Sequence, residues 1–381
     1  MPWQEATTMS QRLEFVMLVL ADRARGGRGF RELCRRFDVS APTGHKWTGR
    51  YLEFGEAGLE DRSRRPHSSP GQTAEEMSRR VIDARREHPA WGGRKLRQYL
   101  VEKGVEDVPA PNTVTAIVRR AGMLDPKESE KHRAWERFER SEPNDLWQMD
   151  YKGHVAMGSH GARCHPLVVL DDHSRYCIGL RACGNERGET VVEELTGMFR
   201  IYGLPMQILT DNGPPWGVPG AVGFEHTWLT VWLLRLGTRV THGRRMHPQT
   251  QGKTERFNRT LGVEPLSGPI EPSLLRYQSR FDAWRPVYNH QRPHDSLGLK
   301  VPASRYRVSE RKFPETLPPV EYGPEDIVRR VQQGGVIDFR GREWTIGKAF
   351  VGEPVGLRAT QKDGLFDVYF CNQRIEQIDV K

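Results

Sequence analysis

Between residues 145 and 261 the chain alternates short apolar runs with amphipathic stretches, and this alternation restricts the fold more than any other feature. The runs have the length of β-strands, whereas the stretches show the 3.6-residue period of helices. We expect strands at 146–151, 165–170, 176–180, 207–211 and 238–241, and helices at 190–202, 224–236 and 254–261. This order predicts a central α/β domain with a mixed five-stranded sheet and helices on its faces.

Two of the apolar runs end in an aspartate, Asp150 and Asp211, and a third acid, Glu255, lies in the basic segment HPQTQGKTERFNRTL at 247–261. A lone loop carboxylate is usually solvated, but two strand ends and a helix can bring three of them together. Phosphoryl transfer on a nucleic acid uses two hard cations roughly 4 Å apart, and carboxylates with water satisfy Mg²⁺. The three acids therefore indicate a site for two Mg²⁺ or Mn²⁺ ions per molecule.

A second pair of acids, Asp171 and Asp172, lies in the turn DDHSR between two expected strands. Aspartate is favoured in turns because its side chain bonds the nearby backbone. We interpret this pair as turn-forming residues without a direct catalytic role.

Two helical units precede the sheet, and each consists of short helices, a tight turn and a basic helix. Helices are expected at 10–24, 30–37 and 41–54 in the first unit and at 77–87, 94–103 and 113–121 in the second, with Ser40 and Asn112 as N-caps. This order is typical of helix-turn-helix DNA-binding domains. The alternative is a pair of small bundles that bind nothing.

The residues expected to contact DNA share a polar or basic side chain in a helix or segment that can face a groove. They are Thr43, Lys46 and Arg50 in the first unit, Thr113, Thr115 and Arg119 in the second, Arg64 and Arg65 in the linker, and Arg244, His247, Gln251, Lys253, Arg256 and Arg259 around Glu255. The linker could equally be a solvated spacer. A net charge of +9 also favours a polyanionic partner, although many soluble proteins are mildly basic.

After Gly334 the apolar period becomes two, and glycine-containing turns separate about five short runs, which predicts a small all-β barrel. The whole chain is therefore expected to be a multidomain α+β protein. The expected division is 1–57 and 74–124 for the helix-turn-helix domains, 58–73 for a basic linker, 125–144 for a connector, 145–310 for the catalytic core with a helical extension, 311–333 for a second linker and 334–381 for the barrel.

The five cysteines are odd in number and lack CxxC spacing, so neither a disulfide framework nor a zinc site is indicated. No apolar run approaches the roughly 20 residues that a membrane span needs. These features favour a cytoplasmic, nucleoid-associated protein with no membrane partner.

Four motifs together resemble the DDE transposases of bacterial insertion sequences, a group related to retroviral integrases. They are WQMD at 147–150, ILTDNG at 208–213, the segment 247–261 and YNHQRPHDSL at 288–297. The resemblance implies a ribonuclease-H-like core with Asp150, Asp211 and Glu255 as its metal-binding triad. Two features depart from the family. The interval between Asp211 and Glu255 is long, with the excess expected in a surface loop at 214–223, and the zinc module of retroviral integrases is replaced by helix-turn-helix units.

The sequence therefore predicts a transposase that binds the terminal inverted repeats of its element, cleaves there and joins the new 3′-hydroxyl to target DNA. Two alternatives are a catalytically silent DNA-binding regulator derived from a transposase and a structure-selective nuclease. Joining two ends in one event requires two active sites, so a dimer or larger oligomer on double-stranded DNA is expected. The barrel could serve this assembly or only pack against its own core.

Overall fold

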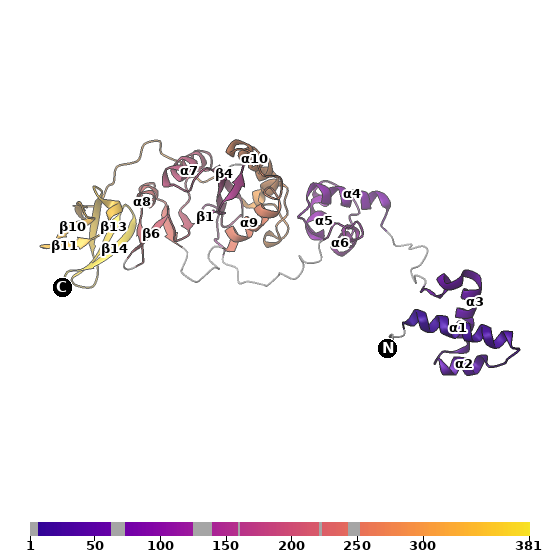
Figure 1. Cartoon of the computed structure of the whole chain (residues 1–381). Helices are drawn as coiled ribbons and strands as arrows, with labels where there is room; N and C mark the ends of the chain where they lie inside the picture. The colour runs from indigo at the N-terminus through magenta and orange to yellow at the C-terminus, as the bar shows by residue number, and fades with distance from the viewer. Residues whose placement is uncertain (1–6, 62–72, 125–138, 159–160, 221–222, 243–251) are drawn as a thin grey trace. The chain divides into compact units, whose positions relative to one another are not determined.

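The computed structural model describes residues 7–61, 73–124, 139–158, 161–220, 223–242 and 252–381 (Figure 1). The chain separates into two compact units, Met1–Gln72 and Thr73–Lys381. None of the helices in the described ranges is long and apolar enough to cross a membrane.

The first unit contains α1 (Thr8–Ala24), α2 (Phe30–Arg36) and α3 (Ala41–Phe54), followed by the short 3-10 helix η1 (Gly55–Leu59). Ser40 caps α3 as predicted, because its hydroxyl accepts the backbone N–H of Thr43. α3 crosses α2 so closely that a Cβ on Gly44 would lie 2.8 Å from the Sγ of Cys34. The three helices enclose a small core of Phe15, Val16, Val19, Cys34, Trp47 and Leu59.

The second compact unit, Thr73–Lys381, begins with a helical domain of three helices, α4 (Glu75–Glu87), α5 (Gly93–Glu102) and α6 (Pro111–Arg120). They pack around the buried Trp91, Leu96 and Val114. The predicted cap Asn112 is wrong: α6 starts at Pro111, with Ala110 at the cap and Asn112 inside the helix. Proline is well suited to the first position of a helix, since its φ is already helical and its missing N–H has no partner there. The helix therefore begins earlier than the asparagine suggested.

The central domain contains a mixed sheet whose main strands have the order β4-β3-β1-β5-β8. They are β1 (Trp147–Tyr151), β3 (Ala162–Asp171), β4 (Cys177–Cys183), β5 (Gln207–Thr210) and β8 (Arg239–His242). β3 pairs antiparallel with β1 and β4, whereas β5 pairs parallel with β1 and β8. The predicted five-stranded mixed sheet is confirmed, and a short sixth strand, β2 (Val155–Met157), extends it beside β3.

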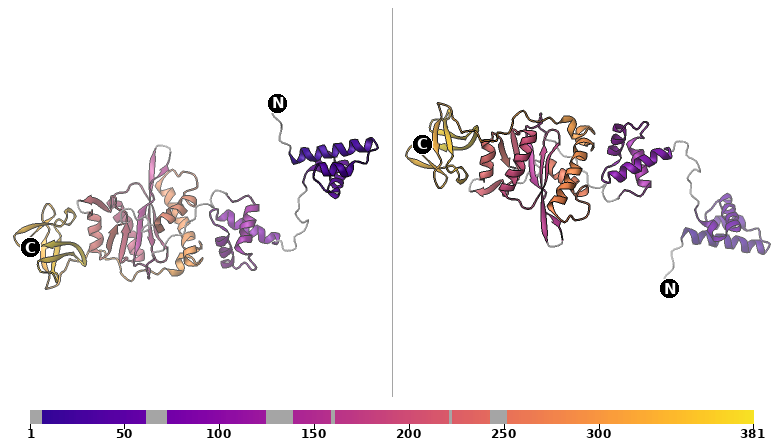
Figure 2. Two further views of the ribbon diagram at one scale, coloured as in Figure 1. Left: turned by 90° about the horizontal axis from the view of Figure 1, so that it is seen from below. Right: turned by 90° about the horizontal axis from the view of Figure 1, so that it is seen from above.

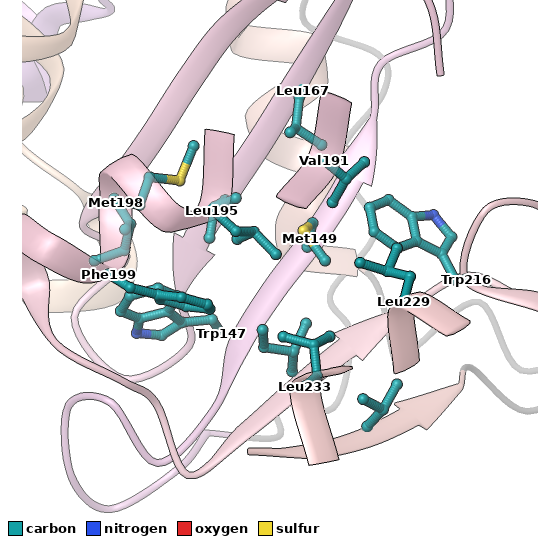
Figure 3. Close-up of a cluster of buried hydrophobic side chains, with 14 of the residues drawn as sticks. Trp147, Met149, Leu167, Val191, Leu195, Met198, Phe199, Trp216, Leu229 and Leu233 are labelled. Atoms are coloured by element: carbon teal, nitrogen blue, oxygen red, sulfur yellow. The ribbon is translucent and has the colours of Figure 1, made fainter. Parts of the chain in front are cut away.

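Helices cover both faces of this sheet (Figures 1 and 2). One face packs on α7 (Gly188–Tyr202) and α8 (Trp228–Arg235) through Trp147, Met149, Leu195, Leu233 and their neighbours (Figure 3). The other face packs on α9 (Gly252–Val263) and α10 (Leu274–His290). Successive strand residues point to opposite faces, so β1 sends Trp147 and Met149 to the first face and Gln148 and Asp150 to the face of α9.

The segment after β5 differs from the predicted loop. β6 (Gly217–Gly220) and β7 (Gly223–His226) form an antiparallel hairpin, and the helix expected from residue 224 begins only at Trp228. Thr227 sets this start because its side chain accepts the N–H of Thr230 while the Thr230 hydroxyl accepts the N–H of Thr227. This reciprocal capping ends the strand and begins α8 within one residue.

The C-terminal module is a sheet rather than the predicted closed barrel. Its strands β9 (Ile327–Arg330), β12 (Pro354–Ala359), β13 (Leu365–Phe370) and β14 (Gln373–Asp379) have the order β14-β13-β12-β9, so β9 and β14 lie at opposite ends without pairing to each other. β10 (Val336–Phe339) and β11 (Arg342–Thr345) form a separate hairpin. The 3-10 helices η4 (Asp295–Leu297), η5 (Pro302–Arg305) and η6 (Lys348–Phe350) complete the second unit.

Helix α8 joins this module to the central domain. Val231 and Leu234 on α8 belong to the same hydrophobic cluster as Ile337, Phe350 and Phe370 of the module. Arg235, also on α8, lies 3.7 Å from Glu353. The module therefore packs against its own core, which was one of the two roles considered for it.

Candidate active site

Asp150 and Asp211 lie level with each other at the carboxyl ends of two neighbouring parallel strands. Trp147 is opposite Ile208 and Gln148 is opposite Leu209, so each aspartate follows the last registered pair by two residues. Both side chains are half-buried. The apolar runs WQM and ILT thus form the adjacent central strands, and the sheet brings together the acids that end them.

Burial disfavours the charged forms of both carboxylates, and the charge of Asp211 adds to this effect at Asp150. Burial, and then the charge of Asp211, raises the pKa of Asp150 to about 6, although a hydrogen bond from Asn258 partly opposes the shift. Burial likewise raises the pKa of Asp211, against the N–H of Gly213 and the charge of His242, which lower it. Two close carboxylates with raised pKa values are stabilised by a proton or a cation between them, and their oxygens are the ligands that Mg²⁺ prefers.

Two hydrogen bonds tie helix α9 to strand β1. The hydroxyl of Thr254 donates to Oε1 of Gln148 at 2.9 Å, and both residues are buried. One turn further, Nδ2 of Asn258 donates to Oδ2 of Asp150 at 3.1 Å. Neither Gln148 nor Asn258 was predicted from the sequence, although Asn258 lies one helical turn from Glu255 and so shares its face.

Glu255 is exposed on the first turn of α9, next to Thr254. Residues three apart on a helix have Cβ atoms about 5–6 Å apart, so Glu255 neighbours the residue that binds Asp150. Within the described ranges, no three His, Cys, Asp or Glu side chains lie close enough together to hold a metal ion. The structure therefore brings Asp150 and Asp211 together and places Glu255 on the helix bound to Asp150. The three carboxylates do not lie close enough together to bind one ion.

Glu186, in the loop between β4 and α7, is another acid near the aspartate pair. Its charge contributes to raising the pKa of both Asp150 and Asp211. Its Oε1 lies 2.8 Å from Nδ1 of His165 on β3. No sequence signal marked Glu186, because it lies in a polar loop and approaches the pair only through the folding of the sheet.

Asp171 and Asp172 are both buried; Asp171 is the last residue of β3, and Asp172 begins the turn that was predicted to contain both. Oδ2 of Asp171 accepts the N–H and the hydroxyl of Ser174, and Oδ1 accepts the N–H of Asn144 at 2.7 Å. Burial raises the pKa of Asp171, whereas the bonds from Ser174 and Asn144 lower it. Asp172 instead bonds to Gln148 and forms an ion pair with Lys253.

The predicted DNA contacts of the first unit occupy different positions on α3. Lys46 is exposed and Arg50 half-buried, and their charged groups lie 4.6 and 5.2 Å from the Trp47 ring centroid. Thr43 is half-buried, with its hydroxyl 2.8 Å from that of Ser40. Lys46 is therefore the most accessible of the three side chains.

In the second helical domain the outward orientation predicted for Thr115 is wrong. The Thr115 hydroxyl donates to the carbonyl of Pro111. A Cβ on Gly93 would lie 2.2 Å from Oγ1 of Thr115, so Thr115 lies where α6 crosses α5. Thr113 is half-buried and Arg119 is exposed.

On α9, Arg256 and Arg259 are exposed, whereas the Lys253 side chain is 16% exposed and paired. The remaining predicted contacts lie outside the described residues; they are Arg64, Arg65, Arg244, His247 and Gln251.

Family comparisons match nearly every domain of the chain. Residues 11–67 match a helix-turn-helix domain and residues 43–118 a homeodomain-like domain. Residues 140–248 and 236–302 match integrase core domains, and residues 326–381 match the C-terminal domain of IS481 family transposases.

Two curated relatives come from bacterial insertion elements. The chain is 24% identical over 251 residues to the uncharacterized 31.7 kDa protein of insertion element IS407 from Burkholderia multivorans, which covers 64% of this chain and 86% of that protein. It is 24% identical over 261 residues to the 39.2 kDa protein of IS476 from Xanthomonas euvesicatoria, covering 67% and 71%. Among solved structures, a chain of the simian T-cell lymphotropic virus intasome in complex with the PP2A regulatory subunit B56 gamma aligns at 16% identity and a TM-score of 0.37, over 79% of this chain and 96% of that one.

Proposed function

Because this chain is an insertion-sequence transposase with helix-turn-helix DNA-binding domains and an integrase core, we propose that it cleaves DNA at the terminal repeats of its element and joins the resulting 3′-hydroxyl to target DNA. Asp150, Asp211 and Glu255 form the metal-binding triad. The observation that carries this assignment is the parallel register of β1 and β5, which sets Asp150 beside Asp211.

The donor set suits hard divalent ions, Mg²⁺ or Mn²⁺, and we assign two of them to each site. Asp150 and Asp211 would hold them from the sheet and Glu255 from α9. When bound, such ions activate the attacking oxygen and stabilise the leaving one. The raised pKa values of both aspartates support this assignment, because burial disfavours each carboxylate's negative charge and a bound metal ion would compensate that charge.

The chain's own residues orient this site and hold DNA near it. Asn258 donates to one oxygen of Asp150 and so fixes the orientation of this carboxylate. Arg256 and Arg259 are exposed on the same helix as Glu255, where they suit contacts to phosphates. Lys46 and Arg119 are exposed cations of the two helix-turn-helix domains and suit contacts with the terminal repeats. Joining two ends requires a dimer or larger oligomer on DNA.

Two other functions fit these observations less well. A catalytically silent regulator is not favoured, because such a protein has no use for two repelling carboxylates at adjacent strand ends. A structure-selective nuclease is not favoured either, since it would not need two helix-turn-helix domains.

The triad is tested by substituting Asn for Asp150 and Asp211 and Gln for Glu255 in the full chain. Each variant should lose at least a thousandfold in cleavage and strand transfer, because a ligand to the ions is removed, yet bind a terminal-repeat duplex within about twofold of the unchanged protein. Glu193→Gln, which changes an exposed acid on α7, is the matched control and should remain active. A triad variant with near-normal strand transfer would remove that residue from the site.

A further inference from the structure

Lys253, in the first turn of α9, points into the protein rather than toward solvent. Its Nζ forms an ion pair with Oδ1 of Asp172 and also lies 3.4 Å from the Asp172 backbone carbonyl oxygen. The Asp172 side chain is completely buried and that of Lys253 is 16% exposed. This position differs from that of a DNA contact, the role predicted for Lys253 from the sequence.

Asp172 belongs to a closed ring of polar contacts around the start of α9. Its Oδ1 accepts Nε2 of Gln148 at 2.7 Å, and its Oδ2 accepts the backbone N–H of Arg140 at 2.8 Å. Gln148 uses its other end, Oε1, to accept the hydroxyl of Thr254 at 2.9 Å. Two consecutive residues of α9, Lys253 and Thr254, are therefore bound to the same Asp172–Gln148 pair.

This ring reaches the candidate active site from two directions. Gln148 precedes Asp150 by two residues on β1, so both side chains lie on the face of the sheet that α9 covers. Glu255 follows Thr254 directly on the helix. Two adjacent anchors fix both the rotation of the first turn of α9 about its axis and its height above β1, and these two quantities determine where Glu255 lies.

Stability alone does not account for a buried ion pair at this point. Removing two charges from water costs free energy that the pair recovers only with good geometry, and apolar residues of similar volume often stabilise a fold as well or better. Charged and hydrogen-bonded partners instead fix the orientation of the groups that they bind. Catalytic groups need a fixed orientation, because displacing one of them by about 1 Å can slow a reaction about a hundredfold.

We propose that Asp172 and Lys253 are positioning residues that fix the first turn of α9 and so bring Glu255 to Asp150 and Asp211. The inference rests on the proposed function, because it assigns both residues to the same metal site. Lys253 then contributes to the chemistry through Glu255 and not through the DNA.

The test compares Lys253→Met, Asp172→Asn, their combination and the conservative Lys253→Arg in the full-length protein. The probe is a pre-cleaved duplex carrying the terminal repeat, with strand transfer followed in single turnover across a Mg²⁺ titration. Lys253→Met and Asp172→Asn should each lower the rate at least tenfold and raise the Mg²⁺ concentration at half-maximal rate several-fold. The double variant should be no worse than the more impaired single one, because both substitutions break the same Lys253–Asp172 ion pair, and Lys253→Arg should recover most of the rate.

Arg256→Met serves as the matched comparison, because it removes an exposed cation from the same helix. If Arg256 contacts phosphate, its loss should weaken duplex binding. It should also reduce the salt slope, the slope of log K against log salt concentration, by about one. Lys253→Met should leave duplex affinity and its salt dependence within twofold of the unchanged protein. Hydrogen exchange of residues 252–258 without DNA or metal should be faster in Lys253→Met and unchanged in Arg256→Met.

Three results would overturn the proposal. One is a Lys253→Met variant whose duplex affinity falls and whose salt slope decreases as in Arg256→Met, since Lys253 would then contact DNA. A second is a lowered rate with an unchanged Mg²⁺ midpoint and no recovery in Lys253→Arg. A third, decisive if the single variants do not fold, is a folded double variant with normal rate and Mg²⁺ dependence. Failure of the proposed function is recognised separately, by strand transfer that persists in Asp150→Asn or is absent from the unchanged protein.

Discussion

Asp150 shows how one residue can serve a site at a cost in stability. Its pKa rises from 3.8 to about 6 in the folded protein, so the native state binds this proton more tightly than the unfolded chain does. Without metal, the destabilisation due to Asp150 is therefore absent below pH 4, grows as the pH rises through the window from 4 to 6 and is complete above it. A carboxylate without its cation thus weakens the fold at neutral pH.

We therefore expect Asp150→Asn to stabilise the metal-free protein at pH 8, by about 1–2 kcal/mol after allowance for partial solvent screening. The amide keeps an oxygen for the bond from Asn258 and removes the repulsion with Asp211. Thermal unfolding in EDTA at pH 8 and pH 4 measures the effect, which should vanish at pH 4, where the native aspartate is protonated. Equal stabilisation at both pH values would show that the charge of Asp150 is not its cause.

The sequence identified the two aspartates because each ends an apolar run, and the position of strand ends can be predicted from such runs. It could not identify Gln148, Asn258 or Glu186 in the same way. Their roles depend on which face of α9 meets β1 and on where the loop after β4 folds, and these are properties of tertiary packing. The same limit explains Lys253, which in the sequence is one basic residue among several and in the structure pairs with an aspartate 81 positions away.

At the scale of elements, periodicity predicted the helices of both helical domains and all five main strands. It was less informative where capping or turn chemistry decides an element's start. The hairpin β6–β7 lies in a segment rich in Gly and Pro that resembles a loop, and Thr227 rather than a change in periodicity sets the start of α8. Asn112 was a plausible cap, but Pro111 begins α6 one position earlier.

Helices α5 and α6 cross too closely to leave room for a side chain at Gly93. A Cβ at Gly93 would lie 2.2 Å from Oγ1 of Thr115 and 2.6 Å from the carbonyl oxygen of Pro111, so the helices would have to separate. We expect Gly93→Ala to destabilise this helical domain by about 1–3 kcal/mol, the usual cost of overpacking. Gly92→Ala is the matched control, since a Cβ there has nothing within 4 Å. Chemical denaturation of the two variants measures the difference, and similar midpoints would mean that the crossing adjusts freely.

At the scale of the whole molecule, the C-terminal module has two surfaces with different consequences. One is the cluster that it shares with α8 through Val231 and Leu234. The other lies on β9, where Ile327 and Val328 are 38% and 44% exposed beside the exposed Arg329 and Arg330. Apolar side chains next to arginines suit contact with a partner chain or with DNA. A simple truncation would disturb both surfaces together, because it would also uncover the apolar face of α8.

A repaired truncation separates the two roles. Ending the chain after Pro319 should expose Val231 and Leu234 and promote aggregation, and adding Val231→Ser and Leu234→Ser to the shortened chain should restore solubility. The repaired protein should bind one terminal-repeat duplex normally, because both helix-turn-helix domains remain, and should lose complexes that pair two ends. Light scattering on the DNA complexes measures this loss. The full-length chain carrying Ile327→Ser and Val328→Ser should reproduce it, since only the β9 surface is changed there. Paired complexes of normal size from both proteins would restrict the module to packing against its own core.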